Sequence, residues 1–76
     1  MKVEVEMLAF GNGDIRIVSL DDSVKNMEVE EQLDQVFMFG QNDAQPLNMP
    51  SVSMGDVIRL NGERFKIAMF GFEKIK

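Results

Sequence analysis

Hydrophobic and charged residues alternate along the start of the chain, and this period predicts a β-strand over residues 2–10. Val3 and Val5 stand between charged residues, as in a strand that buries one face. Residues 11–14 read Gly-Asn-Gly-Asp, and these residue types accept the positive φ angles of tight turns. A second strand, over residues 15–20, is therefore predicted to form a hairpin with the first.

The period changes in the middle of the chain, where apolar residues recur with helical spacing. The residues on the apolar face are Val29, Leu33, Val36 and Phe37. This spacing lines one side of a helix, so we predict an amphipathic helix over about residues 27–39. Asn26 is the expected N-terminal cap, and Gly40 stands where a left-handed residue often ends a helix.

The second half of the chain begins with a segment that has no period. Residues 41–53 contain both prolines and many turn-forming residues, which predicts an irregular loop crossing the molecule. Two further strands, over residues 57–60 and 63–67, flank Asn61-Gly62, the strongest short signal for a β-hairpin. Gly71 then suggests a bend that allows a last short strand.

These elements together predict a single domain over residues 1–76 of the α+β class. We expect a small, curved antiparallel sheet or partly open barrel of about five strands, with one helix packed across it. A chain of this length supports one modest core, and it has no cysteine for disulfides, so its stability must come from packing.

The register of the predicted C-terminal hairpin separates an apolar side from a basic side. It sets Arg59 directly opposite Arg64, with Lys66 on the same side. Like charges in a cross-strand pair repel each other, so acidic side chains are expected nearby, and Glu4 and Glu6 of the first strand are candidates. If they leave the arginines free, the candidate basic face of Arg59, Arg64 and Lys66 is available to an anion.

Composition removes most catalytic chemistry. The chain lacks His and Cys, the commonest general base and the best nucleophile, and its net charge is −5. We therefore expect no enzyme, no cofactor and no metal site. The charge is divided, because residues 1–58 hold three bases and eleven acids, whereas residues 59–76 hold five bases and two acids. This asymmetry indicates an interaction surface without identifying it.

Seven methionines and six phenylalanines are many for 76 residues. Flexible thioethers fill gaps in small cores and also form adaptable binding surfaces. Core packing is expected for Met7 and Met69. A candidate partner surface is expected around the helix end and the long loop, and its residues are Met38, Phe39, Gln41, Asn42, Asp43, Met49 and Met54.

Three segments of the second half carry a resemblance to a known group of proteins. These are Gly-Gln-Asn-Asp at residues 40–43, Ser-Val-Ser-x-Gly-Asp-Val-Ile at residues 51–58 and Gly-Phe-Glu at residues 71–73. In this order they resemble segments of small proteins encoded by bacteriophages, plasmids and integrative elements. The resemblance implies a mobile element inside a bacterial cell as the setting, but it implies no activity.

Three functions are compatible with these features. The first is a protein-binding module that occupies a host or phage protein, for example an inhibitor of host defence. The second is a nucleic-acid or anion-binding module that uses the basic face, with Phe70 stacking on a base. The third is a minor structural or assembly protein. The charged residues within the first strand are incompatible with the apolar run of a signal peptide or a membrane span, so we expect a cytoplasmic protein. We expect it to be a monomer or a small homo-oligomer.

Overall fold

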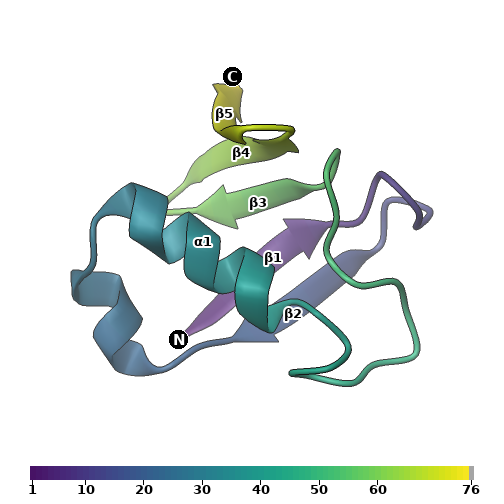
Figure 1. Cartoon of the computed structure of the whole chain (residues 1–76), viewed down its shortest axis with the longest axis horizontal. Coiled ribbons are helices and arrows are strands. Elements are labelled where there is room, and N and C mark those ends of the chain that lie inside the picture. The colour runs from purple at the N-terminus through teal and green to yellow at the C-terminus, as the bar shows by residue number, and fades with distance from the viewer. Residues whose placement is uncertain (76) are drawn as a thin grey trace.

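The chain folds into one five-stranded antiparallel sheet with a single α-helix across one face (Figure 1). This computed structural model describes residues 1–75. In chain order the elements are β1 (Lys2–Glu6), β2 (Ile15–Ser19), the short 3-10 helix η1 (Asp22–Asn26), α1 (Val29–Phe39), β3 (Val57–Leu60), β4 (Glu63–Ala68) and β5 (Gly71–Ile75). The α+β class with five strands and one helix is confirmed.

The strands follow the order β2-β1-β3-β4-β5, and every neighbouring pair is antiparallel. β1 and β3 are far apart in sequence but adjacent in the sheet, so the segment containing η1, α1 and the long loop crosses from one side to the other. Over residues 1–75, β2 and β5 do not pair with each other. The sheet is therefore open, not closed into a barrel.

The C-terminal hairpin has the predicted register. Arg59 lies opposite Arg64, and the turn residues Asn61 and Gly62 have φ angles of +54° and +77°. Such angles suit a two-residue turn whose twist matches that of the strands. The expected bend at Gly71 is also confirmed, since its φ of +93° opens β5 after a turn at Met69 and Phe70.

The predicted end of the helix at residue 39 is confirmed, and three other details of the prediction were wrong. β1 ends at Glu6 and not at residue 10, because the chain turns at Met7, where the Leu8 N–H bonds the Glu6 carbonyl at 3.0 Å. Asn26 does not cap α1, since it belongs to η1, and Glu28 takes the cap position without a side-chain bond. Gly40 ends α1 with a φ of −80°, which is not left-handed.

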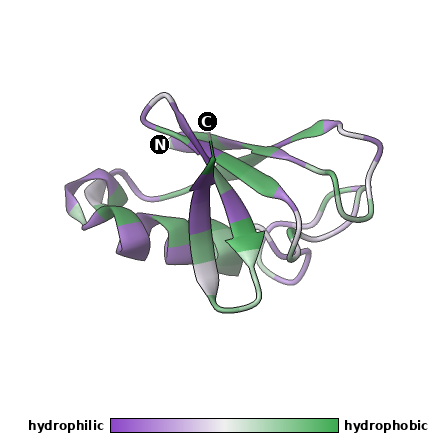
Figure 2. Cartoon of the chain, turned by 90° about the horizontal axis from the view of Figure 1, so that it is seen from above, coloured by the Kyte–Doolittle hydropathy of each residue, from purple (hydrophilic) through white to green (hydrophobic). Residues whose placement is uncertain are grey.

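The core lies between α1 and the sheet. Val5, Val18 and Ile58 from the sheet meet Leu33 and Val36 from the helix, and all five side chains are buried. Figure 2 shows α1 against this face, with its hydrophilic residues turned away from the sheet. The helix therefore buries the stripe that its apolar spacing predicted.

Gly40 is needed for packing and not for a special backbone angle. A Cβ atom there would lie 2.8 Å from the Val36 carbonyl oxygen and 3.0 Å from Val52 Cβ. The Val52 N–H in turn bonds the Gly40 carbonyl at 3.0 Å. The end of α1 and the end of the long loop are thus in direct backbone contact.

Candidate binding surface

Glu6 lies between the two arginines of the predicted basic face. Arg64 donates two hydrogen bonds to its carboxylate, from Nε and from Nη2, each at 2.8 Å, and Arg59 Nε donates a third at 3.1 Å. Arg59 also pairs with Glu4 at 3.4 Å. The expectation that Glu4 and Glu6 relieve the opposed arginines is confirmed.

These contacts hold Glu6 in its charged form. The hydrogen bond from Arg64, with smaller contributions from Arg59, lowers the pKa of Glu6 to about 2, although burial acts in the opposite direction. The Glu6 carboxylate in turn raises the pKa of both arginines. The two arginines thus face two carboxylates, so this part of the sheet has little positive charge left for an external anion.

The remaining lysines of the C-terminal half also have acidic neighbours where the structure describes them. Lys74 Nζ is 2.7 Å from a Glu63 carboxylate oxygen, and Lys66 stands opposite Glu73 in the register of β4 and β5. Phe70 lies in the turn before β5 and not on a strand of the basic face. Base stacking beside Arg59 and Arg64 therefore has no support in this geometry.

Arg16 holds the long loop, a role that the sequence did not suggest. Its side chain is only 1% exposed and faces the core beside Val18. It donates to Asn42 Oδ1 at 2.8 Å, to the Pro50 carbonyl at 2.9 Å and to the Gln45 carbonyl at 2.7 Å. Burial lowers the pKa of Arg16. The register with β1, which sets Arg16 opposite the buried Val5, was the signal that could have revealed it.

The polar residues at the start of the loop make their hydrogen bonds inside the protein. Gln41 Nε2 donates to the carbonyls of Phe37 and Val52 at 2.8 Å, and Asn42 Nδ2 donates to the Met49 carbonyl at 2.9 Å. These bonds explain the Gly-Gln-Asn-Asp segment as a loop anchor. The side-chain amides of Gln41 and Asn42 are therefore engaged within the protein.

Asp56 fixes the segment that leads into β3. It is 1% exposed, and its carboxylate accepts from the Ala9 N–H and the Ser53 N–H, each at 2.8 Å. Gly55 beside it has a φ of +98°. The Ser-Val-Ser-x-Gly-Asp segment is thus a structural clamp that ties the loop before β3 to the loop after β1.

The other residues of the predicted partner surface are divided among several places. Met49 packs against the core, and Asp43 is exposed on the loop. Phe39 lines a hollow with Leu20, Val24 and Met27, while Met38 is exposed elsewhere on α1. Met54 lies at another site, the end of the sheet described next.

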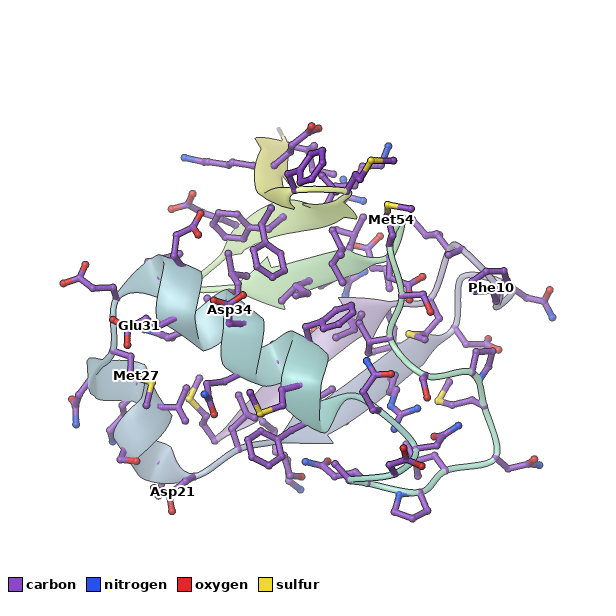
Figure 3. All side chains as sticks on the ribbon, in the orientation of Figure 1. Phe10, Asp21, Met27, Glu31, Asp34 and Met54 are labelled. Carbon is purple, nitrogen blue, oxygen red and sulfur yellow. The ribbon has the colours of Figure 1, made fainter. Side chains whose placement is uncertain are left out.

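Three connections meet at one end of the sheet because the strands alternate in direction. The loop after β1, the segment before β3 and the turn after β4 all lie there, and Figure 3 shows Phe10 and Met54 on this side. Their large apolar side chains are between 50% and 93% exposed. We call this set the apolar end, and its residues are Leu8, Phe10, Met54, Met69 and Phe70.

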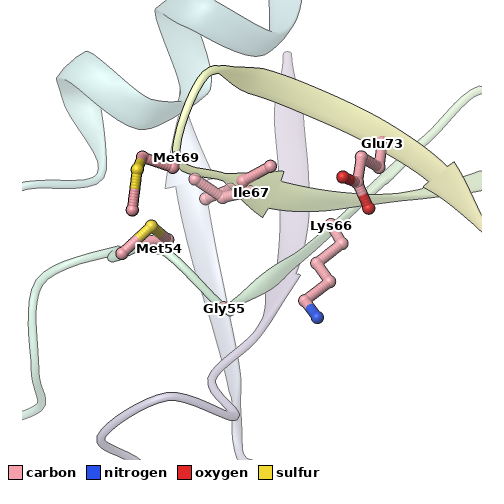
Figure 4. Close-up of a pocket in the computed structure, with 7 residues that line it drawn as sticks. Met54, Gly55, Lys66, Ile67, Met69 and Glu73 are labelled. Carbon is pink, nitrogen blue, oxygen red and sulfur yellow. The ribbon is translucent and has the colours of Figure 1, made fainter.

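Met54 and Met69 lie side by side at the mouth of a hollow of about 350 Å³ (Figure 4). The other residues that line it are Gly55, Lys66, Ile67, Ala68 and Glu73. The prediction that Met69 packs in the core was wrong, because this residue lies in an exposed two-residue turn and is 72% exposed. The prediction for Met7, which is fully buried, is confirmed.

The apolar end contains no recognisable catalytic or metal-binding group. Among residues 1–75, no group of three acidic side chains is placed to hold a metal ion. Neither helix in this part of the chain has the length and apolar character that a membrane span requires. No protein-family model matches the chain, and no curated protein or solved structure matches it either.

Proposed function

We propose that the protein is a non-enzymatic protein-binding module and that it binds its partner through the apolar end. The observation that carries this proposal is the gathering of five large, exposed apolar side chains from three separate loops at one end of the sheet. Exposed apolar groups at one place mark interaction sites, and Met and Phe are enriched in the centres of protein interfaces.

The frame beneath these side chains is ordered by buried polar contacts. Asp56 joins two of the three loops. Gly55 allows Ala9 to approach closely, because a Cβ atom at residue 55 would lie only 3.3 Å from the Ala9 Cβ. A surface held in this way loses less conformational entropy when it binds, which favours affinity.

The charge distribution supports a protein over a nucleic acid as the partner. Glu4 and Glu6 pair with Arg59 and Arg64, and Glu63 pairs with Lys74, so the basic residues are largely compensated. The exposed face of α1 carries Glu30, Glu31 and Asp34, which would repel phosphates.

The mobile-element setting implied by the resemblance suggests which protein is bound. A small binder without catalytic groups acts by occupying a surface, so we propose an inhibitor of a host defence protein. Expression of the chain in bacteria that carry a defence system should raise the plating efficiency of a phage which that system restricts. Unchanged plating across several defence systems would remove this part of the proposal.

Affinity capture tests the binding function itself. The tagged wild-type protein should recover a specific protein from a lysate of the bacterium that carries the gene. The variant Met54→Ser/Met69→Ser/Phe70→Ser should lose it, because these substitutions remove exposed apolar area without touching the core.

A matched control removes three exposed apolar side chains at other places. The variant Val29→Ser/Met38→Ser/Leu47→Ser should still capture the partner. Equal loss in both variants, or no specific protein with the wild type, would contradict binding at the apolar end.

A further inference from the structure

The two edge strands of the sheet differ in the hydrogen bonds that their outer backbone groups make. At β2, the side chain of Gln45 caps the last residue of the strand, because its Oε1 accepts from the Ser19 N–H at 3.0 Å and its Nε2 donates to the Ser19 carbonyl at 2.5 Å. β5 pairs with β4 alone over residues 1–75, and Figure 1 shows no element beyond it. The chain itself therefore caps the end of the β2 edge at Ser19 and leaves the β5 edge open.

The register of β4 and β5 shows which backbone groups the open edge presents. A two-residue turn is closed by a hydrogen-bonded pair, here Ala68 and Gly71, and bonded and non-bonded pairs then alternate. Phe72 and Lys74 fall in the non-bonded pairs. Their N–H and C=O groups are therefore expected to point away from β4, toward a place that another strand can occupy.

A hollow of about 210 Å³ lies next to this edge, between α1 and the β4–β5 hairpin. Phe37, Phe72 and Met69 line it, and Asp34 of α1 contributes the acidic group. Glu31 is exposed on the same helix, and Figure 3 shows it and Asp34 on α1. Lys74, on the same face of β5 as Phe72, is already paired with Glu63. The surroundings thus suit an apolar side chain flanked by a basic one.

A second copy of the chain fits this edge poorly. Two β5 strands related by a two-fold axis pair most fully when Glu73 faces Glu73 of the other copy. A shift by one pair sets Lys74 against Lys74, and a shift the other way sets Phe72 against Phe72 but pairs only residues 71–73 of each strand. Like charges directly opposite each other destabilise a cross-strand pair. The open edge is better matched by a different chain.

We propose that β5 receives an extended, basic segment of the protein partner as a sixth strand, with an apolar side chain of that segment in the hollow and an arginine or lysine beside Asp34. This mode of recognition draws affinity from main-chain hydrogen bonds and specificity from alternate side chains. The inference rests on the proposed function, because β5 begins at the apolar end, directly after Met69 and Phe70. It adds the chemistry of the partner segment that would bind along β5.

A defined peptide tests this edge without the natural partner. The probe is a synthetic peptide of about eight residues with threonine at every second position and valine and arginine in turn between the threonines, so that valine and arginine lie on the same face of the strand. The control peptide has glutamate in place of arginine. Titration of isotope-labelled protein should shift the amide resonances of residues 71–75 and leave those of β2 unchanged. Equal binding of the glutamate peptide, or shifts confined to other elements, would overturn the proposal.

Two substitutions at one position separate the backbone from the side chain. Lys74→Pro removes an N–H expected to face the open edge and leaves the ladder to β4 intact, whereas Lys74→Thr removes the same charge and keeps the N–H. The proline variant should bind the arginine peptide about tenfold more weakly than the threonine variant, the effect of one lost hydrogen bond. Equal affinities would contradict strand addition.

Asp34→Asn tests the charge contribution and should weaken binding of the arginine peptide by about threefold at low salt.

Failure of this inference can be told apart from failure of the proposed function. If the wild type captures a partner through the apolar end but the peptide does not bind β5, the binding function stands and the sixth strand is wrong.

Discussion

Arg16 and Asp56 are buried charged residues, and over residues 1–75 neither is paired with an opposite charge. Arg16 donates to neutral oxygens of the long loop, and Asp56 accepts from two backbone N–H groups. Removal of either side chain leaves several buried polar partners unsatisfied, which costs more than the net value of the bonds. Arg16 thus orders the long loop, and Asp56 orders two of the connections at the apolar end.

Substitution of Arg16 by Met keeps much of its volume but leaves the carbonyls of Gln45 and Pro50 without donors. We predict a loss of about 3 kcal/mol in the free energy of unfolding, measured by urea denaturation. Hydrogen exchange should accelerate first in residues 41–52. The control Arg59→Met, at a half-exposed arginine, should cost less, and equal losses would refute the special role of Arg16.

Glu6 makes stability depend on pH in a defined window. Its pKa is about 2 in the folded protein and 4.5 in its ordinary state, so its stabilising contribution is complete above pH 4.5 and is lost as the pH falls toward 2. We predict that Glu6→Gln is less stable than the wild type at pH 7, because the variant loses the charged partner of both arginines. The loss in the free energy of unfolding should be only about 1 to 2 kcal/mol, since solvent screens the half-exposed arginines. This difference should shrink toward zero near pH 2. A constant difference across the range would show that Glu6 contributes by other means.

At the scale of elements, local chemistry decided what could be predicted. Asn61-Gly62 selects its own turn, so the C-terminal hairpin and the Arg59–Arg64 pair followed from the sequence. The start of α1 did not, since η1 takes up the residues that were expected to cap it. The first strand was predicted to be too long for a similar reason. Met7 continues the apolar alternation of the strand, but it packs into the core from the loop that follows β1.

Gly40 distinguishes two explanations for a glycine at the end of a helix. We predict that Gly40→Ala destabilises the protein by about 2 kcal/mol, because the new Cβ meets Val52 and the Val36 carbonyl oxygen. Gly40→Asn should be at least as harmful, since it adds more atoms at a crowded place. An asparagine that is milder than alanine would instead indicate a left-handed residue, which asparagine tolerates. Thermal unfolding of both variants provides the comparison.

At the scale of the whole molecule, the candidate site was only partly predictable. The neutralisation of Arg59 and Arg64 by acidic residues could be predicted from the register of one hairpin and from the glutamates of the first strand. The apolar end could not be predicted in the same way, because it exists only where three loops meet through the sheet order. Met54 was expected at a surface, but Met69 and Phe70 reach the same end only because β4 and β5 turn there.

Contact between the apolar end and another protein can be tested by site-specific photo-crosslinking in living bacteria. A benzophenone amino acid at Phe70, which is 93% exposed, should leave the fold intact and should crosslink to one discrete protein on irradiation. The same group at Lys25, an exposed residue of η1, should give no such product. Crosslinking at Lys25 but not at Phe70, or at neither position while the protein is folded and expressed, would contradict partner binding at the apolar end.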